Sequence, residues 1–359
     1  MHKLLSIISG GSKYLNSIFY IILKSVICAA LFVFLPGCND NSQFTANVVA
    51  NEPTRSAWLV YWDLDAGEKD LRRTANKLEK LSYFSAYFDE NDHIFIPQEL
   101  NDKKSELKKQ KGKYQTYLTF VNDKQNLDGS VTMKDIEVLR RLFVDDAAME
   151  QHIDEAIALT LLGGYDGIEI DYERIWKEEN IGQLFIKFTN KLYAKALNNN
   201  LQVRLVLEPN TPFSDVDFVN GPEYVVMFYN LYGLHSAPGP KANKDFIQKT
   251  LIQMQALPGE KSVAFATGGC MWGDNGEKIL LTEIEAKTFA AVYDVEAKRD
   301  EDSQCVVFDY QDADSGVQYQ VWYADIKTLN YWIAVVQEQG ENNISMWRLG
   351  GNIDIDKIE

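Results

Sequence analysis

One stretch, residues 165–173, constrains this chain more than any other; it reads YDGIEIDYE. Apolar and acidic residues alternate in it, which is typical of a β-strand because successive side chains point to opposite faces. Glu169, Asp171 and Glu173 therefore share one face of the predicted strand. The same alternation is common on the solvated face of an antiparallel sheet. Helical patterns before and after this stretch instead favour a parallel strand covered by helices, which has no solvated face.

These three acids are a candidate functional site. Carboxylates so close together repel one another, and at least one is expected to keep its proton at neutral pH. Groups with perturbed ionisation are concentrated at active sites. The spacing of Glu169, Asp171 and Glu173 therefore predicts acid–base chemistry rather than a wet outer surface.

The remainder of the chain alternates between strand and helix signals and predicts an α/β fold. Eight segments have the pattern of buried strands: 58–62, 81–88, 114–121, 165–173, 201–207, 223–229, 262–267 and 344–349. Eight such strands imply a (β/α)8 TIM barrel formed as one domain by residues 57–359. The last two strands are separated by more sequence than one helix needs, which predicts a small α+β insertion at about 274–325.

Two further features of the pattern bear on the barrel. Ile153, Ile157 and Leu161 recur every four residues, and we expect them to pack against its wall. The active site of such a barrel lies at the carboxyl ends of its strands. The residues that fall at those predicted ends are Asn122, Glu173, Glu208, Asn230 and Trp347.

The first 37 residues are expected to be a lipoprotein signal peptide. Their charged side chains are three lysines, and the apolar run 25–35 has the length of a signal-peptide core and is short for a membrane span. Residues 35–38 resemble the bacterial lipobox, in which Cys38 would be lipidated and become the mature N-terminus; a chance Gly-Cys pair is the alternative. Residues 38–56 would form a flexible tether. These features predict a lipid-anchored protein of the bacterial cell envelope, on its periplasmic or surface face.

Charge and cysteine content limit the partners. The net charge is −16, and removal of the three signal-peptide lysines brings it to −19, which disfavours nucleic acid. Cys270 and Cys305 would remain in the mature chain, either as a disulfide or as two buried thiols. The histidines and cysteines have no metal-ligand spacing, so we expect neither a metal site nor a cofactor.

The acidic strand resembles the signature of glycoside hydrolase family 18, the chitinases and their relatives. That signature, Asp-Gly-x-Asp-x-Asp-x-Glu, is similar to residues 166–173, with Glu169 at a place where the family has Asp. The family's strand-six Met-x-Tyr-Asp resembles residues 227–230, with Asn230 in place of Asp. Its strand-eight tryptophan resembles Trp347.

The resemblance follows the order of the chain over nearly all of 57–353, and it implies the same barrel. The stretch 321–325, VWYAD, is similar to the branch that includes spore-cortex peptidoglycan hydrolases. Members of the family cleave β-linked N-acetylglucosamine with retention of configuration, and the substrate's own acetamido oxygen attacks the anomeric carbon. The implied partner is therefore a polysaccharide or oligosaccharide that contains N-acetylglucosamine.

The same resemblance implies a role for each site residue. Glu173 would be the general acid and then the general base, and Asp171 would bind the acetamido group. Glu169 would share a proton with Asp171, and Tyr229 would help to hold the acetamido oxygen. The residues implied in substrate binding are Trp347 as an apolar floor, Tyr61 as a wall of the same subsite or as ordinary barrel core, Met227, and Asn230.

The expected function is a glycosidase acting on chitin oligosaccharides, peptidoglycan or the core of an N-linked glycan. The alternative is a cell-surface lectin that binds glycans on the same barrel without cutting them. The family's non-catalytic members usually lack the acid, whereas Glu173 is present here. Glu169 and Asn230 are the two departures from the family pattern.

Overall fold

The computed structural model describes residues 54–109 and 112–359. The expected signal peptide, the lipobox Cys38 and nearly all of the tether lie outside these residues. Within the described part of the chain, no helix combines the length and apolar character needed to cross a membrane.

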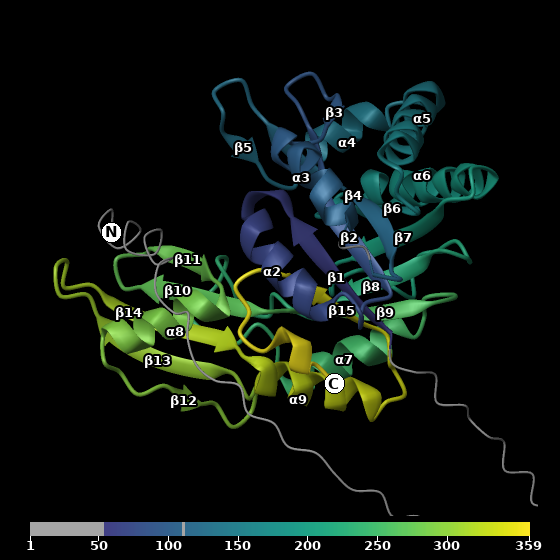
Figure 1. Ribbon diagram of the computed structural model, residues 1–359. Helices are drawn as coiled ribbons and strands as arrows, with labels where there is room; N and C mark the ends of the chain where they lie inside the picture. The colour runs from purple at the N-terminus through teal and green to yellow at the C-terminus, as the bar shows by residue number, and fades with distance from the viewer. Residues whose placement is uncertain (1–53, 110–111) are drawn as a thin grey trace, which may run out of the picture. The chain divides into compact units, whose positions relative to one another are not determined.

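A closed barrel of parallel strands forms the centre of the fold (Figure 1). Its strands are β1 (Arg55–Val60), β2 (Lys80–Phe88), β4 (Gln115–Gln125), β6 (Gly167–Asp171), β7 (Gln202–Leu207), β8 (Glu223–Met227), β9 (Lys261–Ala266) and β15 (Ile344–Trp347). β1 pairs with both β2 and β15, and a pairing of β2 with β4 closes the ring. The predicted (β/α)8 barrel is confirmed, and each strand overlaps its predicted segment.

Helices surround the barrel, as the alternating pattern predicts. They are α2 (Leu64–Thr74), α3 (Gln98–Lys109), α4 (Ile136–Leu142), α5 (Asp146–Gly163), α6 (Glu179–Asn198), α7 (Lys244–Met254) and α9 (Ile326–Gln337). Short 3-10 helices occur at η1 (Tyr61–Asp63), η2 (Ile175–Lys177) and η3 (Ile355–Lys357). Two short antiparallel strands, β3 (Ile94–Phe95) and β5 (Val131–Thr132), pair with the ends of β2 and β4.

The packing of α5 confirms only part of the prediction made from its sequence. Ile153 and Ile157 are buried as predicted, but Leu161 is 47% exposed, so that part of the prediction is wrong. A strict spacing of four advances about 40° around a helix at each step because the helix has 3.6 residues per turn. The buried stripe therefore continues through Thr160.

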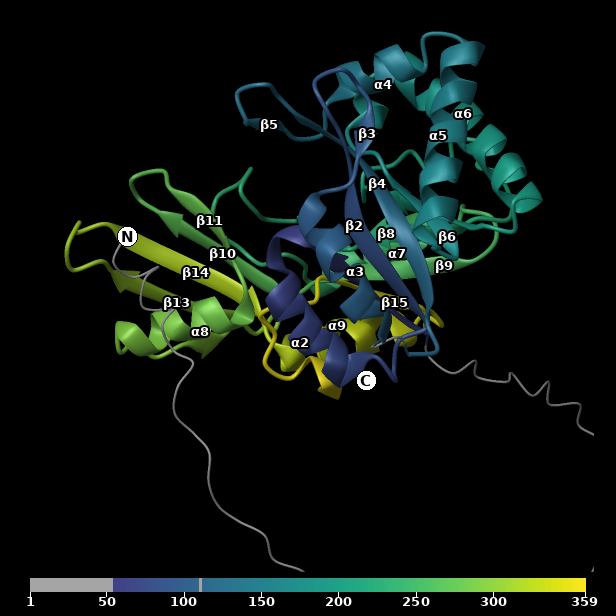
Figure 2. The ribbon, with the colours of Figure 1, turned by 45° about the horizontal axis from the view of Figure 1, so that its top comes forward.

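A second, antiparallel sheet follows β9 and confirms the predicted insertion (Figure 2). It comprises β10 (Gly268–Gly273), β11 (Lys278–Leu281), β12 (Lys298–Arg299), β13 (Val306–Gln311) and β14 (Gln318–Ala324), and α8 (Glu283–Val292) packs on it. A side chain at Gly269 would place its Cβ 1.8 Å from the backbone oxygen of Trp322, so β10 and β14 can approach only with glycine there. Cys270 and Cys305 are both buried and free.

Candidate active site

The two faces of β6 have opposite environments, as the alternation predicts. Ile168 and Ile170 point outward into the main hydrophobic core, and beyond the strand end Tyr172 does the same. Tyr172 Oη lies 2.8 Å from Nε2 of the buried His152 on α5, which fixes the strand to its covering helix. Burial lowers the pKa of His152 to about 4, so it is neutral at physiological pH. Glu169 and Asp171 therefore face the barrel interior.

Glu169 lies within the barrel and receives four hydrogen bonds. Its carboxylate accepts from Trp58 Nε1 at 2.5 Å, Thr119 Oγ1 at 2.7 Å, Ser82 Oγ at 2.8 Å and Arg204 at 2.7 Å. Both of its oxygens are engaged, and among the described residues it has no hydrogen bond to Asp171. This geometry gives Glu169, which is longer than the aspartate of the family pattern, an anchoring role in the barrel interior.

Arg204 is the centre of this buried polar layer. It is opposite Glu169 in the β6–β7 register and opposite Glu223 in the β7–β8 register. Its guanidinium donates to Glu169 at 2.7 Å and to Glu223 at 2.9 Å, and it also reaches the hydroxyls of Ser82, Ser56 and Ser345. Burial acts to lower the pKa of Arg204, but the attraction of Glu223 and Glu169 outweighs it and the pKa is raised. Lys80 also pairs with Glu223 at 2.7 Å, so the layer closes the bottom of the site with two cations and two carboxylates.

Shortening Glu169 to aspartate, the residue of the family pattern, is expected to destabilise this protein. The shorter side chain cannot keep all four donors, and an unsatisfied buried donor costs roughly 1–3 kcal/mol. Urea unfolding of Glu169→Asp measures the loss. The matched control is Glu338→Asp at the exposed end of α9, where a surface change is expected to stay within about 0.5 kcal/mol. Equal midpoints for the two variants would contradict the anchoring role of Glu169.

Asp171 occupies the next inward position above Glu169. It is buried, and its Oδ1 has no hydrogen-bond partner. Burial raises the pKa of Asp171 well above its usual value, and the nearby charges of Glu173 and Glu169 raise it further. Tyr87 Oη is a second buried polar atom without a partner. A buried carboxyl and a buried phenol without partners call for an explanation, and a bound water, ion or ligand would provide one.

Glu173 lies just beyond β6, where the strand reaches the open end of the barrel. Its backbone is clamped by Asn122, which accepts from Glu173 N at 2.9 Å and donates to Glu173 O at 3.1 Å. Burial raises the pKa of Glu173, with Glu208 and Asp123 adding to the shift, while Lys134 opposes it. The Glu173 carboxylate is ion-paired with the Lys134 ammonium.

Aromatic side chains form the floor beside these acids. Trp347 is packed edge-on against Phe84, with ring centres 4.7 Å apart, and against Trp58 at 5.9 Å. Met227 and Tyr229 are buried in the same apolar cluster, which fills the upper part of the barrel interior. Burial raises the pKa of Tyr229 well above its usual value, with Asp171 adding to the shift. Tyr61 is half-buried and packs against the cluster.

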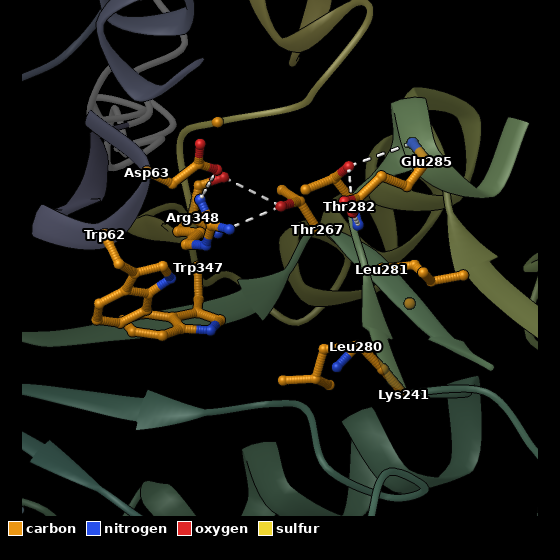
Figure 3. Close-up of a pocket in the computed structure, with 12 residues that line it drawn as sticks. Trp62, Asp63, Lys241, Thr267, Leu280, Leu281, Thr282, Glu285, Trp347 and Arg348 are labelled. Carbon is orange, nitrogen blue, oxygen red and sulfur yellow. Dashed lines mark hydrogen bonds and ion pairs between the residues drawn. The ribbon is translucent and has the colours of Figure 1, made fainter. Parts of the chain in front are cut away.

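Hollows lie on both sides of Trp62, a half-exposed side chain just after β1. One, of about 400 Å³, lies between Trp347 and the insertion and is lined by Leu280, Leu281 and Thr282 among others (Figure 3). The other, of about 640 Å³, is lined by Tyr61, Tyr87, Phe95, Asp123 and Met133 among others. Together they give a cleft with an aromatic residue at its middle.

Several residues of this cleft were not predicted from the sequence. Trp62, Tyr87 and Asp123 line it, and Lys134 contacts Glu173. Trp62 is the last residue of the predicted strand 58–62, and Asp123 lies two residues beyond the predicted strand 114–121, so proximity to a strand end was an available signal. Lys134 lies 39 residues before its partner Glu173, and nothing in its local sequence indicates that contact.

Asn230 adds no charge to the candidate site, and the described histidines belong to no group arranged to hold a metal ion. Asn230 is exposed and has a left-handed backbone with φ of 68°, a conformation that asparagine tolerates better than most residues. Among residues 54–109 and 112–359, no group of three or more His, Cys, Asp or Glu side chains is arranged to hold a metal ion.

Comparison with solved structures identifies the architecture. The spore cortex-lytic enzyme SleL from Bacillus cereus is similar over 85% of this chain and 72% of its own, with 18% identity and a TM-score of 0.70. A chitinase from Chromobacterium violaceum matches over 85% of this chain and 96% of its own, at 16% identity and a TM-score of 0.69. The chain has the barrel fold of these enzymes.

A plant structure extends the comparison. The class V chitinase from Nicotiana tobaccum in complex with NAG4 matches over 85% of this chain and 97% of its own, at 14% identity and a TM-score of 0.64. A scan against protein-family models and a search of curated proteins each found no match. At these identities the likeness establishes the fold, as the resemblance in the sequence implied.

Proposed function

We propose that this protein is a glycosidase that cleaves β-linked N-acetylglucosamine in chitin oligosaccharides or peptidoglycan. The fold is that of chitinases and of a spore cortex-lytic enzyme. One neighbour carries NAG4, an oligomer of the same sugar. Asp171 at the end of β6 and Glu173 just beyond it lie toward the open end of the barrel, where enzymes with this architecture have their active sites.

The observation that carries the proposal is the unpaired Oδ1 of Asp171. A buried polar atom without a partner is rare in proteins because it loses its hydration and gains nothing in return. The acetamido N–H of N-acetylglucosamine is a donor of the right kind for this oxygen. A sugar ring on Trp347 would present its apolar face to the indole and its acetamido group to the interior.

The mechanism follows from the positions of the acids. Glu173, on the rim, would protonate the glycosidic oxygen and later remove a proton from water, which requires a raised pKa. Asp171, deeper in the barrel, would orient the acetamido group so that its oxygen attacks the anomeric carbon with retention. Tyr229 Oη would stabilise that oxygen. Glu169 would act through Arg204 and Trp58 by holding the strand in place.

Substrate binding would extend from Trp347 to both sides of Trp62. Tyr61 would line the hollow beside β2 and β4, and Met227 would support the floor from below. Asn230, exposed at the rim, would contact the glycan only at its edge. We further propose that lipidation of Cys38 anchors the protein in the bacterial cell envelope.

Incubation with defined N-acetylglucosamine oligomers and with purified peptidoglycan tests the proposal. We expect shortened oligomers whose new reducing ends are initially in the β configuration, as NMR of the early products would detect. New ends of α configuration would exclude the retaining mechanism. Intact substrate in every reaction would overturn the proposed activity.

A glycan-binding lectin is the second candidate, and one observation favours it. The ion pair between Lys134 and Glu173 favours the ionised form of the group that should donate a proton. A wild-type protein that binds the oligomers in calorimetry but leaves them uncut would support the lectin.

A further inference from the structure

Lys134 is held at the candidate acid by its backbone as well as by its charge. It follows β5 and has a left-handed backbone, with φ of 56°. Its N–H donates to Asp123 Oδ1 at 2.7 Å, and the next residue, Asp135, donates from its N–H to Asn122 O at 2.6 Å. Asn122 also clamps the backbone of Glu173. The lysine and the acid are therefore positioned by the same strand end.

This pair conflicts with the chemistry proposed for Glu173. An ammonium in contact favours the carboxylate form, whereas a general acid must begin the reaction with its proton. The titratable groups that face Glu173 are Lys134 after β5, Asp171 on β6, Asp123 on β4, Glu208 after β7 and Tyr229 after β8. Lys134 is the cation in this set, and it opposes the rise in the pKa of Glu173 that burial causes.

The Lys134 ammonium has the capacity to bind a ligand. A lysine carries three donors, and among the described residues its hydrogen-bond partner is Glu173 alone. Its side chain is 31% exposed, and that of Glu173 is 15% exposed, so solvent can reach both groups. Burial acts to lower the pKa of Lys134, but the attraction of Glu173 outweighs it and the pKa is raised. The group is thus a fixed positive charge beside Glu173.

We propose that Lys134 is a specificity-determining residue that binds a carboxylate on the sugar at the leaving side of the cleaved bond. The inference rests on the proposed function. When the substrate carboxylate takes the ammonium, Glu173 loses its counter-ion and can hold the proton that it must donate. A neutral glycan offers no such exchange and leaves the ion pair in place.

Muramic acid has the carboxylate at the required position. Its lactyl ether is on O3, next to the O4 that forms the glycosidic bond. A carboxylate on that arm therefore lies within a few bonds of the oxygen that Glu173 would protonate. The preferred bond would join N-acetylglucosamine to a muramic acid with a free carboxylate.

Because the chain is strongly acidic, an anionic substrate needs a local positive charge at the site in order to bind. A net charge of −16 repels anionic polymers. Beside the acids of this cleft, a substrate carboxylate would be repelled unless a positive charge meets it. Lys134 supplies that charge at the reacting bond.

The test compares three substrates of similar length: glycan strands freed of peptides by an amidase, the same strands with their carboxyl groups reduced to alcohols, and a neutral N-acetylglucosamine hexamer. Wild type is expected to prefer the first. Lys134→Met should reverse this preference, with kcat/KM falling about 10- to 100-fold on the carboxylate strands, the range for losing a hydrogen bond to a charged group. Its activity on the hexamer should rise.

Two further variants separate this role from a structural one. Lys134→Arg keeps the charge and is expected to retain the wild-type preference. Lys124→Met removes a lysine from the same strand end, where it pairs with Asp92 at 3.1 Å, and should leave the preference unchanged. Thermal midpoints measured alongside show whether each variant is folded.

The pH profile gives an independent readout. Loss of the Lys134 charge raises the pKa of Glu173, so more of the acid is protonated at high pH. The alkaline limb of kcat/KM for the neutral hexamer should then move upward by about 1–3 pH units. An unmoved limb in a folded Lys134→Met protein would overturn the proposal.

The outcomes distinguish this inference from the proposed function. If Lys134→Met lowers the rates on all three substrates by the same factor, the carboxylate role fails while the glycosidase remains. If wild type cleaves none of the three, the proposed function fails and the inference with it. Equal wild-type rates on native and reduced strands would also refute the carboxylate role.

Discussion

Replacing Arg204 with methionine is expected to lower the free energy of unfolding by about 3–5 kcal/mol, the range for removing one partner of a buried ion pair. The side chain is 1% exposed, and it pairs with Glu169, which is fully buried, and with Glu223. Lys80 would still pair with Glu223 at 2.7 Å, but no second cation contacts Glu169 among the described ion pairs. The loss should be seen as a lower urea midpoint at an unchanged m value.

A double-mutant cycle distinguishes charge from packing in that loss. Adding Glu169→Gln to Arg204→Met removes the uncompensated charge, so the double variant should be more stable than the sum of the single changes predicts. Arg72→Met is the matched control, because Arg72 is 64% exposed where it pairs with Glu68, and such pairs contribute about 0–1 kcal/mol. Additive losses would show that the layer is held by packing alone.

The sequence contains a signal for this layer. Arg204 is a charged residue in the middle of a largely apolar strand, and a buried arginine requires partners within reach. Parallel pairing places neighbours on adjacent strands side by side, so an inward Arg204 predicts an acid on β6 or β8. The register that selects Glu169 rather than Asp171 is set by the closure of the barrel, which local pattern does not encode.

The barrel itself could be predicted because its signals are local. Each strand is an apolar run bounded by turn residues, and each helix has its own periodicity. Contacts between a short hairpin and a strand end are harder to predict from the sequence, because the two segments are far apart in the chain. Lys134 reaches Glu173 only because β5 folds back antiparallel on β4, and that hairpin depends on a two-residue pairing too short to recognise.

The acids of β6 are thus separated by depth rather than being equivalent. Glu169 is neutralised by Arg204 at the bottom, Asp171 is unpaired above it, and Glu173 meets Lys134 at the rim. The alternation in the sequence placed them on one face. Their distinct environments come from other strands. The family resemblance implied a proton shared between Glu169 and Asp171, and it contained no information on the donors that surround Glu169 here.

Replacing Glu173 with glutamine is expected to lower kcat about 10²–10⁴-fold, the usual contribution of a positioned general acid or base. Glutamine has the same shape but cannot release a proton to the glycosidic oxygen. The amide also removes the charge that Lys134 contacts, so the protein should stay folded and still bind oligosaccharides. Initial rates on a neutral N-acetylglucosamine hexamer and calorimetric binding of the same hexamer measure the two effects separately.

Glu178→Gln is the matched control for this change. Glu178 follows in the same loop after β6, but it is half-exposed and pairs with Arg140 on the surface at 2.7 Å, so its loss should leave kcat near the wild-type value. A Glu173→Gln protein that cleaves at the wild-type rate would show that the proton comes from another group. Asp123 is then the next candidate, because burial raises its pKa and it lines the same hollow as Tyr87. Such a result would also contradict the role proposed for Lys134, because the ammonium would no longer face the acid that reacts.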